Sequence, residues 1–134
     1  MRAADTSVVV AAFATWHEHH DAARGVLDAG LDLIEHCALE TYSVLTRLPP
    51  PHRTSGTVIR DFIAARFPRP FLRLKEAAYR NFVLELPDYT ISGGSAYDAL
   101  VAATAAGHNA ELITLDRRAL PVYQHYGVRT QFLR

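Results

Sequence analysis

Residues 95–133, SAYDALVAATAAGHNAELITLDRRALPVYQHYGVRTQFL, carry the pattern that decides the fold class. Along this stretch the spacing of the apolar residues changes between that of a helix and that of a strand. It predicts helices over Ser95–Ala106 and Arg117–Tyr126, each followed by a strand, over Glu111–Leu115 and Val128–Leu133 respectively. Gly107 and Gly127 end the two helices. Helices that alternate with short apolar strands are typical of an α/β sandwich around a mostly parallel central sheet.

The residues in front of this unit add further helices and one short strand. Helical spacing predicts three helices that lie over Trp16–Gly30, over His36–Leu48 and around Val58–Ile63. Prolines follow the second and third of these and end them sharply. Phe71–Leu74 is a candidate for a short buried strand, and Lys75–Leu86 for a helix that ends before Pro87.

The apolar segment near the N-terminus allows two interpretations of its local structure. The β-branched run Val8–Val10 favours a strand, whereas Asp5-Thr6-Ser7 in front of it is a typical helix start. Val8–Ala14 is also the one stretch that resembles a signal-peptide core, but an acidic residue precedes it and no clear small-residue cleavage site follows. We therefore expect no export.

Composition indicates an ordinary globular protein. A chain of 134 residues fits a single domain over residues 1–134, and 49% hydrophobic with 21% charged residues is the balance of a protein with a packed core. No apolar run approaches the roughly 20 residues of a membrane helix. The single cysteine, Cys37, excludes an intramolecular disulfide and a cysteine-cluster metal site. We expect a cytoplasmic protein with no membrane partner.

The formal net charge is zero, but the charges are unevenly distributed. Residues 1–35 hold two basic against six acidic residues, and residues 36–83 hold eight basic against three acidic ones. Thirteen of the fourteen basic residues are arginine, which binds phosphate through a bidentate fork. The basic segment is therefore either a face that follows a phosphate backbone or an ordinary solvated surface.

Four carboxylates stand at or beside the predicted strand-to-helix junctions: Asp5, Glu40, Asp98 and Asp116. In an open α/β sheet such junctions gather at the carboxyl ends of the strands, where ligands bind. Several ionised carboxylates in one pocket need a cation, and oxygen ligands suit Mg²⁺ or Mn²⁺. Each acid also has a structural explanation, because Asp5 and Asp116 could be N-caps, Ser95 and Asp98 match a capping box, and Glu40 could favour its helix dipole.

Four sequence pieces together resemble the PIN-domain family and, within it, the VapC-type toxins. They are Asp5-Thr6-Ser7, the run ETYSVLTRLP at residues 40–49, the run YDALVAATA at residues 97–105 and the run LDRRAL at residues 115–120. The pieces occur in the family's order and span nearly the whole chain. The glycine-containing loop over residues 91–95 also matches the family's approach to the third acidic motif.

The resemblance implies a sandwich around a parallel sheet, one or two divalent metal ions and cleavage of RNA. It also implies that the first strand stops near Asp5 and a helix follows. On this basis the catalytic and metal-binding residues are Asp5, Glu40, Asp98 and Asp116, with Thr6 and Thr114 as supporting residues. Pro121 departs from the family's usual helix after the last acid.

We expect Asp5 and Asp98 to hold the metal ion, and Glu40 and Asp116 to complete the cage, hold a second ion or accept a proton. Candidates for contact with RNA are Arg47, Arg117 and Arg118. The resemblance further implies a VapB-type antitoxin as partner and a homodimer. The apolar helices from His36 to Phe67 carry more hydrophobic surface than a small domain readily covers, which also favours a dimer.

Several competing interpretations stay open at this point. His17, His19 and His20 lie close together in sequence but lack a metal-binding spacing, so a solvated or packed helix face is the expected role. Ser95 and Cys37 lack the context of a nucleophile. A phosphoacceptor receiver domain is also α/β with an acidic pocket, but here Asp5 stands alone and Lys75 is the only lysine. The same four acids could also belong to a non-catalytic PIN-fold binding protein or to a free-standing RNA-processing enzyme.

Overall fold

The computed structural model describes residues 1–134 and contains one sheet of four parallel strands in the order β2-β1-β3-β4. The strands are β1 (Arg2–Ala4), β2 (Asp32–Leu33), β3 (Glu111–Thr114) and β4 (Thr130–Phe132). The α-helices are α1 (Thr6–Phe13), α2 (His20–Asp28), α3 (Glu35–Thr46), α4 (Gly56–Arg66), α5 (Glu76–Glu85), α6 (Ser95–Gly107) and α7 (Leu120–His125). Two short 3₁₀ helices, η1 (Leu86–Tyr89) and η2 (Arg117–Ala119), precede α6 and α7. The α/β class with a parallel sheet is therefore confirmed.

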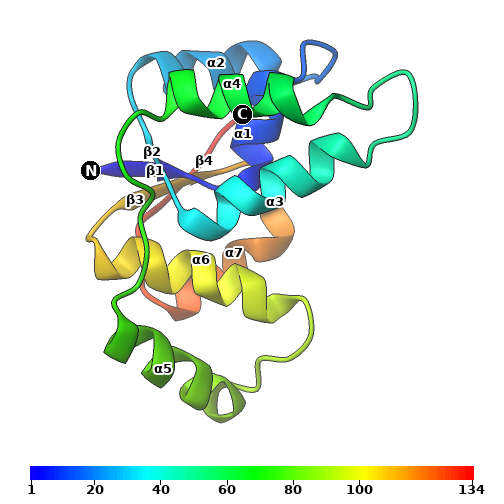
Figure 1. Cartoon of the computed structure of the whole chain (residues 1–134). Coiled ribbons are helices and arrows are strands. Elements are labelled where there is room, and N and C mark those ends of the chain that lie inside the picture. The colour runs from blue at the N-terminus through cyan, green and yellow to red at the C-terminus, as the bar shows by residue number, and fades with distance from the viewer.

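Helices lie on both sides of the sheet. In Figure 1, α1, α2 and α4 lie above the sheet and α6 and α7 below it. Because both faces are covered, the apolar residues of the two central strands, Ala3, Ala4, Leu112 and Ile113, are fully buried. None of the helices combines the length and the apolar character that a membrane crossing requires.

The strand order creates a crevice beside β1. The chain leaves β1, passes through α1 and α2, and returns as β2 on one side of β1, while β3 lies on the other side. Ligands of open α/β sheets bind at such a switch point, outside the carboxyl ends of the strands. Asp5 directly follows β1 and Asp116 closely follows β3, so this crevice receives acidic side chains from both strands.

The ambiguous segment Val8–Val10 is helical and lies in α1. Asp5 caps this helix, because its carboxylate accepts a hydrogen bond from the backbone N–H of Val8 at 3.4 Å. Thr6 to Phe13 then places Val8, Val9, Ala11 and Ala12 in the core. The first strand thus stops before Asp5 and a helix follows, as the family resemblance implies.

The predicted strand Phe71–Leu74 is wrong. Only Leu72 pairs, in a single parallel bridge to Ile34. Pro70 lacks the N–H that would extend the pairing, and Phe71 is 40% exposed. On this side of the sheet the edge strand is instead β2, whose two residues are too few to show a strand pattern in the sequence.

The helix predicted from Trp16 begins only at His20. His17 and His19 lie in the turn in front of it, where the ring nitrogen Nδ1 of His17 accepts the N–H of His19 at 3.0 Å. His20 donates from its own ring to the carbonyl of Ala11 at 2.9 Å. The three histidines therefore do not share a helix face, and two of them make local hydrogen bonds.

The helix predicted over Arg117–Tyr126 is divided into η2 and α7. Pro121 lies in the first turn of α7, where a residue without an N–H is well tolerated because that group has no helical partner. This position accounts for the departure of Pro121 from the family pattern.

The basic segment pairs with the acidic N-terminal segment. Arg66 binds Asp28 at 2.7 Å, Arg69 binds Asp32 at 2.6 Å, and Arg73 lies 3.7 Å from Glu35. These arginines are thus already engaged by carboxylates. The pairing favours the solvated-surface interpretation of this segment over a continuous phosphate-binding face.

Candidate active site

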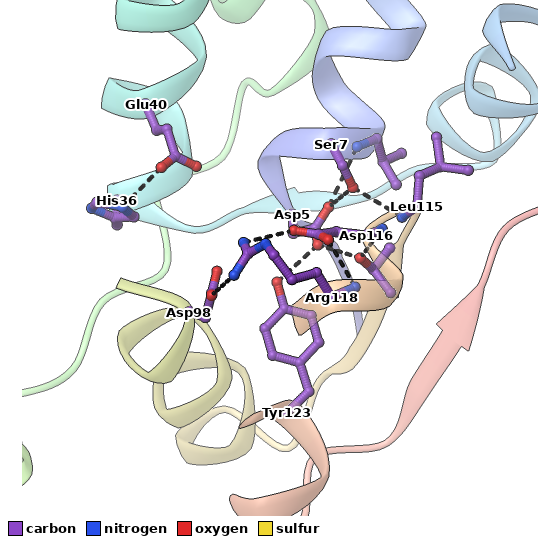
Figure 2. Close-up of polar contacts among 11 residues, drawn as sticks. Asp5, Ser7, His36, Glu40, Asp98, Leu115, Asp116, Arg118 and Tyr123 are labelled. Carbon is purple, nitrogen blue, oxygen red and sulfur yellow. Dashed lines mark hydrogen bonds and ion pairs between the residues drawn. The ribbon is translucent and has the colours of Figure 1, made fainter. Parts of the chain in front are cut away.

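A pocket of about 190 Å³ opens where β1 and β3 end. It brings together all four predicted acids, which come from the ends of two strands and from two helices. Its lining consists of Asp5, Thr6, Ser7, His36, Glu40, Tyr97, Asp98, Val101, Asp116, Arg118 and Tyr123. Figure 2 shows Asp5, Asp98 and Asp116 around the side chain of Arg118, with Glu40 and His36 farther to one side.

Asp5 lies at the bottom of the pocket and is 3% exposed. Both of its carboxylate oxygens accept hydrogen bonds, one from Ser7 and the backbone of Val8, the other from Thr114 and from Tyr123 at 2.8 Å. Burial nevertheless raises the pKa of Asp5 above its usual value, because desolvation of the charge outweighs these bonds. The fold therefore holds this carboxylate in one orientation, although removing its charge from water is unfavourable.

Hydroxyl groups join the exits of β1 and β3. The Thr114 hydroxyl donates to Asp5 and accepts the backbone N–H of Asp116 at 2.9 Å. The Ser7 hydroxyl also donates to Asp5 and accepts the N–H of Leu115 at 2.9 Å. The supporting role expected for Thr114 thus has a structural basis in the position of two acids. The Thr6 hydroxyl is buried in the same pocket without a well-formed hydrogen bond, and it lies beside Glu40, where it helps to lower the pKa of that acid.

Arg118 lies between two of the acids. Its guanidinium contacts Asp98 and Asp116 at 3.0 Å each, and its backbone N–H donates to Asp116 at 3.0 Å. The contact with Asp98 and the charges of both acids raise the pKa of Arg118 further, so it stays cationic. In this structure an arginine of the chain itself offsets the repulsion between Asp98 and Asp116.

Glu40 forms a separate part of the pocket with His36. The two residues are one helical turn apart on α3, and His36 Nε2 lies 3.6 Å from a Glu40 oxygen. Contact with His36 is the main cause that lowers the pKa of Glu40, and partial burial opposes it. The His36 ring in turn stacks on Tyr97, with ring centroids 5.1 Å apart and planes at 5°.

We expect Tyr123→Phe to destabilise the protein by about 1 kcal/mol, because a buried carboxylate loses one of its donors. Burial and the charge of Asp5 raise the pKa of Tyr123, so the phenol remains a donor at any working pH. Tyr126→Phe is the matched control, since the Tyr126 hydroxyl is buried without a partner and its removal should be neutral or stabilising. Urea unfolding of the two variants measures the difference, and equal midpoints would contradict the assigned bond.

Comparison with known proteins identifies the family. The family model described as PIN domain matches residues 3–124. This chain belongs to the PIN-domain family. It is 45% identical over 133 residues to Ribonuclease VapC40 of Mycobacterium tuberculosis, covering 99% of both chains. It is also 38% identical over 136 residues to Ribonuclease VapC27 of that organism, covering 94% of this chain and 92% of the relative. These matches place it among the VapC-type PIN ribonucleases.

Solved PIN-like structures agree with the fold. FitAB bound to an IR36 DNA fragment matches with a TM-score of 0.72 at 17% identity, covering 98% of this chain and 94% of that one. FitAcB from Neisseria gonorrhoeae matches with a TM-score of 0.69 at 18% identity, covering 97% and 96%. At these identities the likeness supports the α/β architecture of the PIN domain.

The three candidate arginines lie in different places. Arg118 lines the acidic pocket of the PIN domain. Arg117 lies over the Phe132 ring, 4.3 Å from its centroid, and does not line the pocket. Arg47 caps the end of α3 and also lies outside the pocket lining. Of the three, Arg118 alone lines the pocket, whereas the charge of Arg47 acts on Glu40 and contributes to the lowered pKa of that acid.

Five residues of the PIN-domain pocket were not predicted from the sequence as site residues: the apolar Val101 and the polar or aromatic Ser7, His36, Tyr97 and Tyr123. Ser7 and Tyr97 lie within the motifs that resemble the family, close in sequence to Asp5 and Asp98 respectively. This position could have predicted them as pocket residues. His36 precedes Glu40 by one helical turn, which places both on one face. Tyr123 reaches Asp5 across the fold, and nothing in its local sequence indicates that contact.

Proposed function

We propose that this PIN-domain protein is a metal-dependent endoribonuclease that hydrolyses phosphodiester bonds in structured RNA, and that it acts in the cytoplasm as the toxin of a toxin–antitoxin pair. The observation that carries the proposal is the single pocket at the ends of β1 and β3 that four carboxylates line. The names of the two relatives, both ribonucleases, support the reaction class.

The chemistry of the pocket fits a hard divalent cation such as Mg²⁺ or Mn²⁺. All the candidate ligands are oxygens, and the buried Thr6 hydroxyl beside Glu40 has no well-formed hydrogen bond, which a hydrated ion could supply. Arg118 already shows that a cation is favoured beside Asp98 and Asp116. While Arg118 is paired with Asp98 and Asp116, no three of the acids converge on one point, so binding of an ion would require Arg118 to leave them. Asp5, Glu40, Asp98 and Asp116 would then hold it.

When bound, the cation supplies positive charge to the scissile phosphate and lowers the pKa of water beside it. Asp5 contributes a carboxylate whose orientation is fixed before the substrate arrives. Glu40 is half-buried with a lowered pKa, so it is ionised at neutral pH and able to accept a proton. Arg118 is exposed and, once free of the acids, can donate to a phosphate oxygen.

Cleavage of RNA with mapped ends tests the proposal. The purified protein should cut RNA at a small set of defined positions in Mg²⁺ or Mn²⁺ and should stop in excess chelator. Cleavage that continues in chelator would contradict the metal requirement. Absence of cleavage in every metal would favour a non-catalytic PIN-fold binding protein.

We expect Arg118→Gln to bind Mn²⁺ several-fold more tightly than the unmodified protein in the absence of RNA. The substitution removes the cation that competes for Asp98 and Asp116. Arg117→Gln is the matched control, because it removes the same charge from the neighbouring residue, which stacks on Phe132 outside the pocket. Calorimetric titration with Mn²⁺ gives both affinities, and equal values for the two variants would show that Arg118 does not compete.

The proposed partner is a VapB-type antitoxin. A nuclease that attacks the RNA of its own cell must be held inactive, and a segment that folds on binding could place a basic side chain among the four acids. Arg118 shows that the pocket accepts a guanidinium. Inhibition should then weaken as Mg²⁺ rises, whereas an inhibition constant independent of Mg²⁺ would mean that the antitoxin blocks RNA elsewhere.

We also propose a homodimer. An apolar groove of about 970 Å³ lies between α3 and α4, and Leu39 beside it is 69% exposed. Exposed apolar surface of this kind is typical of an interface. Sedimentation at micromolar concentration should give the mass of a dimer, and a monomeric mass across that range would contradict it.

A further inference from the structure

Tyr97 presents an aromatic ring to solvent at the edge of the acidic pocket. The residue is 57% exposed and stands in the first turn of α6, directly before Asp98. One face of its ring stacks on His36 with nearly parallel planes. Tyr97 does not belong to the hydrophobic core cluster. Its exposure is therefore not explained by core packing.

The His36 contact fixes the orientation of the Tyr97 ring. His36 is itself held on α3, and its side chain is only 19% exposed. Tyr97 thus lies on a rigid helix turn with a rigid neighbour, so a planar ligand would stack on it without first having to order the ring. Tyr97 also lines the same pocket as the four acids, so its ring lies beside the place where they would hold the substrate.

We propose that Tyr97, supported by His36, is a stacking platform for the base next to the scissile phosphate. The inference rests on the proposed ribonuclease function and adds a base subsite to it. Recognition of single-stranded RNA proceeds largely by stacking of splayed bases on aromatic side chains. A phosphate bound among the acids and a base bound on Tyr97 would together place one nucleotide.

Two different roles for Tyr97 make different predictions. If Tyr97 only joins α3 to α6, its substitution would change the stability of the fold. It would not change how much more tightly the protein binds RNA with bases than an abasic ribose-phosphate chain. A role as contact for a protein partner would leave RNA binding unchanged. Neither of these two roles explains why Tyr97 lines the acidic pocket together with Asp5 and Asp116.

The test compares two probes in Ca²⁺, a cation with oxygen ligands that could hold a phosphate among the acids, under conditions in which a gel shows that both probes stay intact. One is a short fluorescein-labelled single-stranded RNA of mixed sequence, and the other is an abasic ribose-phosphate chain of the same length. The variants are Tyr97→Leu, Tyr97→Phe and the control Tyr89→Leu. Tyr89 is also exposed and also contacts a histidine, with its ring centroid 4.6 Å from that of His125, but it lies outside the pocket.

We expect Tyr97→Leu to bind the mixed RNA roughly tenfold more weakly, as loss of one stacked base predicts. The abasic chain should bind equally to Tyr97→Leu and to the unmodified protein, and Tyr97→Phe and Tyr89→Leu should keep full affinity for both probes. Equal affinity of Tyr97→Leu for the mixed RNA, or an equal loss with the abasic chain, would overturn the platform. If the unmodified protein cleaves RNA but the Tyr97 variants bind normally, only this inference fails; if it neither binds nor cleaves RNA, the proposed function fails as well.

Discussion

Asp98→Asn is expected to reduce RNA cleavage by about a hundredfold or more, because it removes a charged ligand without changing the side-chain volume. Asp98 lies on α6 with its side chain only 16% exposed, and its sole ion pair is with Arg118. The substitution therefore changes the charge of the pocket while leaving the hydrophobic core untouched. Unfolding should be nearly unaffected.

Cleavage rates at saturating Mg²⁺ measure this effect. Asp88→Asn is the matched control, since it makes the same chemical change at an exposed residue of η1 outside the pocket. The control should cleave at the unmodified rate, and Asp98→Asn should also need more Mn²⁺ for half-maximal binding. Undiminished cleavage by Asp98→Asn would contradict a mechanism that needs all four carboxylates, whether or not the reaction depends on a metal ion.

The sheet and the acidic pocket could be predicted largely from local sequence signals. The apolar spacing and the glycines at the helix ends predicted α6, β3 and the helical segment that follows β3, because each of these signals lies within one element. The rule that strand exits gather at one sheet edge then placed Asp5 and Asp116 together. The same rule grouped Glu40 and Asp98, which lie in helices beside the junctions, and the family resemblance then gave all four acids a role; the structure places the four in one pocket.

Short elements and distant contacts could not be predicted. The two residues of β2 are too few to show alternation, and Leu72 pairs through one bridge only. The end of α3 was expected at Leu48, but the helix ends at Thr46 and Arg47 caps it, with backbone angles of φ −111° and ψ 4°. The positions of Tyr123 and Arg118 depend on how α7 and η2 pack, which no pattern of spacing specifies.

Asp5→Asn is expected to abolish cleavage as strongly as Asp98→Asn, yet to leave the metal-free protein at least as stable as the unmodified one at about pH 8. Burial raises the folded-state pKa of Asp5 above its usual value. The folded protein therefore binds this proton more tightly than the unfolded chain does. Stability from this group is present at low pH and is lost as the pH rises through the folded pKa.

Asparagine removes that pH dependence because it does not titrate. Its single amide oxygen can still cap α1 and accept the Ser7 hydroxyl, while its NH2 group faces the Thr114 and Tyr123 hydroxyls, whose oxygens must then accept instead of donating. The cost of the buried charge is thus relieved while the cap is kept. The stability advantage of Asp5→Asn should be largest at about pH 8 and should shrink as the pH falls and the aspartate takes up its proton. Asp5→Ala is the contrasting variant.

Alanine at this position leaves the Ser7, Thr114 and Tyr123 hydroxyls without their shared acceptor and removes the cap of α1. It should cost about 2 kcal/mol or more at every pH. Urea unfolding of the three proteins in chelator, between about pH 4 and pH 8, separates these effects. If Asp5→Asn is less stable than the unmodified protein at high pH and recovers on acidification, the carboxylate is stabilised by its four donors and burial does not dominate. The expected order, with asparagine above aspartate and alanine below both at high pH, would mean that the fold carries a buried charge at the cost of stability because the reaction needs it.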